Sequence, residues 1–241
     1  MSRRGAARLP ALLAAAAAVA ACGKEATPFP PGLDPLEPTD RVAWPAPTAT
    51  DPYPEGTSFA DAAGNPTAGG AAGYSYGLAR AYLAVPLSTT WQALQIPPGV
   101  LIAIYPDRDG VDCAFTPDVE PGYAVSFRLH ETPKNSGPLG RSNWFEVTWR
   151  AGVVAGTAEA PSQVNVRYQK TGGTTWIKVM AGSIVATEPA PGVTALEFVR
   201  HVNAPDEDGA EALDWIRRYF EALRGHVHGT PPPPNCGLSV P

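Results

Sequence analysis

The chain has 241 residues, which is enough for one sizeable domain with flexible ends. Apolar residues make up 44% of the chain, so a hydrophobic core is possible, whereas many of the 28 prolines and 24 glycines fall within residues 23–73 and 229–241. The net charge is −5 and the sequence has no basic stripe, which argues against a nucleic-acid-binding protein because contacts to phosphate dominate such binding.

The first 22 residues have the layout of a secretory signal. Three arginines among the first eight residues form a basic start, and the apolar run over residues 9–21 is too short for a transmembrane helix. The run ends in Val-Ala-Ala-Cys, which resembles the lipobox of bacterial lipoproteins. The resemblance implies a lipoprotein signal peptide over residues 1–21, cleavage before Cys22 and acyl chains such as palmitate on Cys22. An ordinary secretory signal with a chance cysteine is the alternative reading.

A lipid anchor on Cys22 predicts where the protein resides. It would tie the protein to a membrane of the cell envelope, facing the periplasm. Gly23 stands where aspartate is the inner-membrane retention signal of enteric bacteria, so we expect the outer membrane. Loss of the three signal arginines would change the net charge from −5 to −8, so an anionic membrane surface would not attract the mature chain. We expect no nucleic-acid partner, and we expect a monomer.

Residues 22–73 show neither helical nor strand periodicity. Proline fixes φ and removes a hydrogen-bond donor, and proline-rich segments favour extended conformations that act as spacers. We therefore expect residues 22–73 to be a flexible tether, residues 74–228 to form the domain, and residues 229–241 to be a proline-rich tail.

The domain opens with a predicted strand and a short helix. Residues 74–84 alternate enough for a strand. The period then changes, because Leu87, Trp91 and Leu94 follow helical spacing behind a proline that suits a first helical turn. Prolines at 97–98 end this helix.

Five strand candidates rich in β-branched and aromatic residues come next, with glycine or proline between them. Connections this short imply antiparallel neighbours. The predicted strands are residues 123–131, 143–156, 162–170, 174–189 and 192–204.

A long amphipathic helix is predicted near the C-terminus, within residues 205–225. Its start is acidic, which suits the helix dipole. The helix has an apolar stripe that must pack against something large, and the sheet is the available surface. The stripe consists of Leu213, Ile216, Phe220 and Leu223. Gly225 is expected to end the helix.

This order of elements resembles the helix-grip fold of the START-like superfamily, also called SRPBCC, which includes polyketide cyclases and the birch-pollen allergen. The local sequence of residues 79–94 is similar to the opening strand and tryptophan-bearing helix of that superfamily, and residues 181–205 are similar to its last hairpin. One departure is a proline- and aspartate-rich insert at 105–121. The resemblance implies an α+β fold in which a curved antiparallel sheet of about six or seven strands packs on the long C-terminal helix.

The resemblance also implies a cavity between the sheet and the helix that holds a lipid or another apolar small molecule. The alternative is an ordinary core without a cavity. The side chains expected in or near the cavity are those of Trp149, Met180, Leu196, Phe198, Trp215 and Phe220.

No P-loop, dinucleotide fingerprint, nucleophile elbow or zinc-protease motif is present, so we expect no cofactor and no metal, and the catalytic residues stay unknown. His130, Glu131, Arg200 and His201 are candidates for acid–base chemistry near a pocket, although polar side chains on strands are more often solvated. Three function classes therefore remain open: a ligand-binding protein, a cyclase- or hydrolase-like enzyme using the same cavity, and a structural or interaction lipoprotein.

Two cysteines remain once Cys22 is assigned to lipid. Cys113 and Cys236 are candidates for a disulfide, because the periplasm is oxidising. Such a bond would hold the proline-rich tail to the insert. Two independent free thiols are the alternative.

Overall fold

The computed structural model describes residues 28–36, 52–63, 73–95, 111–133, 143–205 and 207–230. The expected signal peptide, Cys22, Cys236 and most of the expected tail over residues 229–241 lie outside these residues. Within the described part of the chain, no helix combines the length and the apolar character needed to cross a membrane.

Eight strands form one antiparallel sheet in the order β1-β2-β8-β7-β6-β5-β4-β3. Strands β3 to β8 follow one another as a meander, and β8 then pairs with β2, which brings β1 to the far edge. The strands are β1 (Gly56–Ala63), β2 (Ser75–Leu83), β3 (Val111–Pro117), β4 (Val125–Pro133), β5 (Phe145–Gly156), β6 (Pro161–Gly173), β7 (Val179–Ala190) and β8 (Val193–Asn203).

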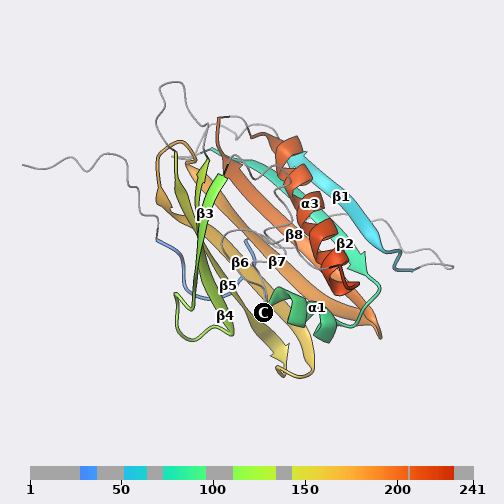
Figure 1. Ribbon diagram of the computed structural model, residues 1–241. Helices are drawn as coiled ribbons and strands as arrows, with labels where there is room; N and C mark the ends of the chain where they lie inside the picture. Colours follow the sequence, from blue (N-terminus) through green and yellow to red (C-terminus); the bar gives the residue numbers. More distant parts are fainter. Residues whose placement is uncertain are drawn as a thin grey trace, which may run out of the picture.

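The long helix α3 (Gly209–Val227) lies along one face of the sheet, over β1, β2 and β8 (Figure 1). Asp208 caps its first turn, because the carboxylate accepts hydrogen bonds from the backbone N–H groups of Ala210 and Glu211. Ile216, Phe220 and Leu223, from the expected apolar stripe, are fully buried. We call the face that α3 covers the inner face and the opposite one the outer face.

Gly77 on β2 allows α3 to approach the sheet closely. A Cβ atom at this position would lie 3.1 Å from the Leu213 side chain and 3.2 Å from the backbone of Ala212. The end of α3 differs from the sequence expectation, because the helix continues through Gly225 to Val227. Gly229, two residues further on, takes the left-handed conformation that ends the helix, with a φ of 88°.

The short helix α1 (Leu87–Leu94) closes one end of the inner face, where it contacts β6, β7, β8 and α3. Leu87, Trp91 and Leu94 are all buried, as their helical spacing predicted. The hydroxyl group of Thr90 lies 2.9 Å from that of Thr194 on β8, so a buried polar pair also fixes the helix to the sheet.

The predicted fold class is confirmed: the described residues form an open antiparallel sheet with a long C-terminal helix across it, the helix-grip arrangement. The sheet has eight strands, whereas about six or seven were expected. The two extra strands are the edge strands β1 and β3. Strand β3 lies within the insert at 105–121, and β1 lies within the expected tether.

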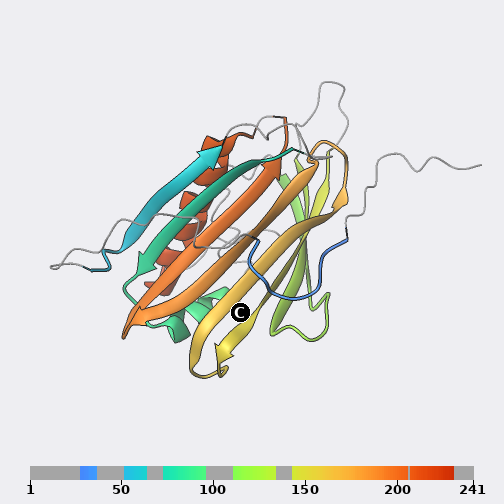
Figure 2. The ribbon, with the colours of Figure 1, turned by 180° about the vertical axis from the view of Figure 1, so that it is seen from behind.

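The tether expectation needs a further correction. Residues 28–36 lie against the outer face of the sheet, as the blue segment in Figure 2 shows, and residues 56–63 form β1. Both stretches find partners for their backbone groups on the sheet, which the proline content alone did not predict. We call residues 28–36 the strap.

Candidate functional site

A row of six residues crosses the inner face from β2 to β4, at positions that the strand register fixes. Each residue pairs directly with the next across neighbouring strands, so all of them point to the same face. In spatial order the row is Gly77, Arg200, Gly182, Tyr168, Trp149 and Phe127.

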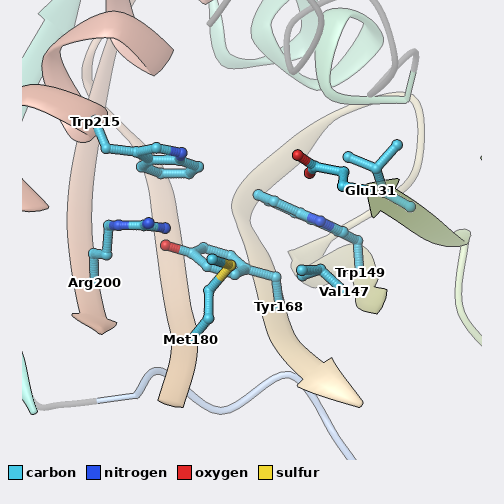
Figure 3. Close-up of a pocket in the computed structure, with 8 residues that line it drawn as sticks. Glu131, Val147, Trp149, Tyr168, Met180, Arg200 and Trp215 are labelled. Atoms are coloured by element: carbon cyan, nitrogen blue, oxygen red, sulfur yellow. The ribbon is translucent and has the colours of Figure 1, made fainter. Parts of the chain in front are cut away.

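Gly182 makes room for the largest member of this row. A Cβ atom on Gly182 would lie 2.2 Å from the ring of Tyr168, so any other residue would collide with the ring. The Tyr168 ring therefore lies across β7, and its hydroxyl group faces the guanidinium group of Arg200 on β8 (Figure 3). Tyr168 is 1% exposed.

Aromatic rings from the sheet and from α3 stack around Trp149 on β5. Its ring centroid lies 4.2 Å from that of Tyr168, 5.7 Å from that of Phe127 and 6.4 Å from that of Trp215. Tyr219 on α3 adds a further nearly parallel ring at 6.2 Å. Such pairs stabilise a fold by about 0.5–1.5 kcal/mol each beyond their buried area, so the cluster holds α3 against the middle of the sheet.

Arg200 is the cation of this cluster. It is 2% exposed, its guanidinium group lies 4.4 Å from the ring centroid of Trp215, and Nη2 donates to the Glu207 carboxylate at 3.1 Å. The ion pair and the ring face both compensate the loss of hydration that burial of a charge entails.

A pocket opens between these rings, as Figure 3 shows, with a volume of about 10 Å³, which is room for a single water molecule. Most of its lining is apolar, and two buried charged residues, Glu131 and Arg200, are the exceptions. The lining residues are Leu129, Glu131, Val147, Trp149, Tyr168, Met180, Arg200 and Trp215.

The two buried tyrosines beside the pocket stay neutral under ordinary conditions. Burial raises the pKa of Tyr168, and the charge of Arg200 and its hydrogen bond to the phenol oppose that rise. Burial raises the pKa of Tyr219 as well, and its neighbour Tyr168 adds to the effect. Both phenols can therefore donate a hydrogen bond at neutral pH.

The residues expected in a cavity separate into two groups. Trp149, Met180 and Trp215 line the pocket. Leu196, Phe198 and Phe220 are at most 2% exposed and pack in the core away from it. Whether any of the six contacts a ligand stays a prediction.

The four acid–base candidates fall on both faces of the sheet. Glu131 and Arg200 line the pocket on the inner face. The neighbouring residues His130 and His201 point to the outer face, because side chains alternate along a strand. There His130 lies 3.4 Å from Glu146, and His201 stacks on Tyr74 with ring centroids 4.0 Å apart. The pocket thus contains a carboxylate and a guanidinium group but no imidazole.

Sequence reasoning missed Tyr168, Gly182, Val147 and Leu129 as parts of this site. Tyr168 and Val147 lie in predicted strands, but the linear sequence does not indicate that both line the same pocket. The signal that unites them is the register between strands, and register becomes visible only once the strands are paired.

Cys113 lies on β3 and is disulfide-bonded. Both other cysteines, Cys22 and Cys236, lie outside the described residues, so the pairing of Cys113 with Cys236 stays a prediction. Among the described residues, no group of three or more histidine, cysteine, aspartate and glutamate side chains could hold a metal ion. His228, just beyond the end of α3, lies 3.0 Å from the carboxylate of Glu55.

No protein-family model matches the chain, and no curated protein matches it. Solved structures do resemble it in fold. The Zhui aromatase/cyclase from Streptomyces sp. R1128 is 16% identical, with a TM-score of 0.41, and the match covers 64% of this chain and 93% of that one. A START superfamily protein from Mycobacterium smegmatis is 14% identical, with a TM-score of 0.41, and the match covers 65% of this chain and 98% of that one.

The lipid transfer and protein localization domain of human StarD13 is 12% identical, with a TM-score of 0.40, and the match covers 74% of this chain and 85% of that one. Likenesses this distant transfer no ligand, activity or site residue to the chain.

Proposed function

We propose that the chain is a lipid-anchored protein of the cell envelope whose domain binds an apolar small molecule between the sheet and α3. The observation that carries the binding proposal is the pocket around Trp149, where aromatic side chains from the sheet and from α3 surround a space that also contains Arg200 and Glu131. The anchoring proposal depends on the resemblance of residues 19–22 to a lipobox.

The lining favours a flat ligand that is apolar over most of its surface. The faces of Trp149, Tyr168 and Trp215 offer stacking partners for a planar group. Arg200 and Glu131 are the polar groups that would orient such a ligand, because a charged donor and a charged acceptor stand among apolar walls. We therefore propose a ligand with one polar group at one end.

A ligand larger than water must displace side chains on entry, because the pocket has a volume of only about 10 Å³. Met180 is the side chain best suited to move, since it is unbranched and adapts its shape to its neighbours. Trp215 is carried by α3, so a small displacement of that helix would also widen the space. The binding proposal therefore includes a more open state of the pocket.

Tryptophan fluorescence tests the binding proposal. The probe is 4-bromo-4′-hydroxybiphenyl, a flat apolar molecule with one hydroxyl group, whose bromine quenches a tryptophan that it contacts. We expect saturable quenching in the full chain, and we expect Trp149→Phe and Trp215→Phe to lose most of it. Trp176→Phe is the matched control, because Trp176 is 38% exposed and does not line the pocket.

Three outcomes would overturn the binding proposal: quenching that does not saturate, that survives both pocket substitutions, or that disappears in the Trp176→Phe control. Thermal unfolding of each variant verifies that the fold is intact. A folded protein without saturable quenching would favour the structural or interaction lipoprotein, in which the aromatic cluster is solid core.

Labelled palmitate tests the anchoring proposal separately. We expect the wild-type chain to incorporate the label and to sediment with membranes when it is expressed in a bacterium. Cys22→Ser should abolish both, whereas the neighbouring substitution Lys24→Ala should change neither. Equal labelling of the wild type and Cys22→Ser would show that residues 19–22 are not a lipobox.

A further inference from the structure

The strap is bound to the outer face along its whole length, mainly through its backbone. Side chains of Gln169 and Asn165 on β6 donate hydrogen bonds to the carbonyl groups of Pro28 and Leu33, at 2.9 and 3.0 Å. At the other end of the strap, the N–H group of Leu36 donates to the hydroxyl group of Ser183 on β7 at 2.9 Å.

Arg150 on β5 holds the middle of the strap. It is 4% exposed, it donates to the carbonyl group of Pro30, and its guanidinium group lies 3.8 Å from the ring centroid of Phe29. Tyr123 covers Arg150 as well, with its ring centroid 5.0 Å away, and its hydroxyl group accepts a hydrogen bond from the N–H group of Gly32 at 2.8 Å. Glu120 forms an ion pair with the same guanidinium group.

Shape and charge on the outer face also match the strap. A Cβ atom on Gly152 would lie 2.9 Å from Leu33, so the glycine provides the space that this leucine side chain occupies. Burial lowers the pKa of Arg167 on β6, and the strap residue Asp34 opposes that change through its charge. The strap is therefore a built part of the folded domain rather than a loose end lying on it.

We propose that the bound strap limits how far the lipid on Cys22 can lie from the sheet, and so holds the outer face of the sheet close to the membrane that carries this lipid. We call this short connection between Cys22 and the strap the leash. This inference rests on the lipid anchor proposed above. Its partner is the bilayer surface next to the anchor, and its interaction surface is the strap together with the outer face of β5, β6 and β7.

The number of residues between Cys22 and the sheet sets the greatest distance that can separate the lipid anchor from the domain. Pro28 follows Cys22 by six residues, so at about 3.5 Å per residue the anchor and the bound strap are at most about 21 Å apart. Without the bound strap, the next described residue is Pro52, and the same calculation for 30 residues allows about 105 Å. Binding of the strap thus shortens the reach of the anchor about fivefold.

The leash also sets which side of the domain faces the bilayer. The strap lies on the outer face, whereas α3 covers the inner face, as a comparison of Figure 1 with Figure 2 shows. The sheet therefore stands between the anchor and α3. A ligand would reach the pocket on the inner face from the side away from the anchoring membrane.

Energy transfer to lipids measures both distance and side. The full lipidated chain is reconstituted into phosphatidylcholine vesicles that contain a headgroup-labelled acceptor lipid. A donor is attached at Thr187→Cys, on the outer face of β7, or at Arg217→Cys, which is exposed on α3. We expect at least twofold stronger transfer from position 187 than from position 217.

Two further changes lengthen the leash. Phe29→Ser with Leu33→Ser removes the side chains of the strap that pack against the sheet. A 20-residue glycine-serine insertion after Glu25 lies outside the strap and keeps all of its residues. Both changes should lower the transfer from position 187, and the double substitution should also remove the difference between the two donor positions.

Equal transfer from the two donors in the wild type would overturn the leash, as would transfer from position 187 that neither change lowers. Vesicle flotation of each sample against a Cys22→Ser control separates the two proposals. If the chain floats but the two donors give equal transfer, the lipid anchor is supported and the leash is overturned. If the chain does not float, both proposals are overturned.

Discussion

Gly182 and Tyr168 show how one missing side chain positions another. The Tyr168 ring on β6 occupies the space above Gly182 on β7, and it reaches Arg200 on β8, two strands away, only because Gly182 has no side chain there. The aromatic cluster and the side of the pocket formed by Tyr168 therefore depend on a glycine that contributes no side-chain contact of its own.

We predict that Gly182→Ala destabilises the protein by about 1–3 kcal/mol, because the added methyl group forces the buried ring to move. Urea unfolding measures the change. The control is Gly225→Ala, inside α3, where a Cβ atom would meet nothing nearer than 3.5 Å and the loss of a helical glycine should stabilise by about 0.5–1 kcal/mol. Equal effects of the two substitutions would contradict the prediction.

The burial of Tyr219 predicts that the free energy of unfolding depends on pH in the alkaline range. Burial raises its pKa in the folded state, whereas the unfolded chain releases the phenol proton near pH 10. Its contribution to stability is therefore fully present below about pH 10 and is lost as the pH rises beyond that value. Between pH 8 and pH 11 the free energy of unfolding should fall less in Tyr219→Phe than in the wild type. Identical falls would contradict this reading.

At the scale of elements, β4 to β8 and both described helices lie close to where the sequence placed them. Alternating apolar residues and an amphipathic stripe are properties of a segment by itself, so a single sequence reveals them. The edge strands β1 and β3 were missed. Their neighbours in the sequence are rich in proline, glycine and aspartate, and each strand forms by pairing with a partner on one side only.

The cap of α3 is an element whose energetic contribution can be measured. We predict that Asp208→Ala destabilises the protein by about 1 kcal/mol, because two backbone N–H groups lose their acceptor. Asp208→Asn should restore most of the loss. Asp214→Ala, which removes exposed ion pairs with Arg217 and Arg218, should cost less than about 0.5 kcal/mol. A larger effect at residue 214 than at residue 208 would contradict the assignment of the cap.

At the scale of the whole molecule, the domain extends further towards the N-terminus than residue 74. The strap and β1 both contribute contacts to the sheet. A chain that begins at residue 74 lacks them and leaves an edge of β2 unpaired. Since backbone hydrogen bonds contribute about 0.5–1.5 kcal/mol each, we predict that it loses at least about 3 kcal/mol relative to a chain that begins at residue 28.

That loss corresponds to a fall of about 6–12 °C in Tm for a domain of this size, which thermal unfolding measures. An intermediate chain that begins at residue 52 keeps β1 but not the strap, so it separates the two contributions. Equal Tm values for all three chains would show that residue 74 is the true start of the domain.

The candidate site was less predictable than the fold, for a physical reason. Trp149, Met180 and Trp215 could be proposed because large apolar residues in amphipathic segments point inwards. Their grouping with Tyr168 around one small pocket follows from pairings between strands that lie far apart in the sequence. The amino-acid sequence does not reveal these pairings directly, because the same alternation of apolar and polar residues is compatible with several strand registers.

The strand order has a consequence for the time course of folding. From β3 to β8, each new strand pairs with the one made just before it, so these contacts close over short loops as the chain is completed. The pairing of β2 with β8 instead joins residues far apart in the sequence, since Ser75 pairs with Val202. Closing so long a loop carries a larger entropic cost than closing the short loops between β3 and β8, and it slows folding. We therefore expect the pairing of β2 with β8 to be the late step that completes the sheet.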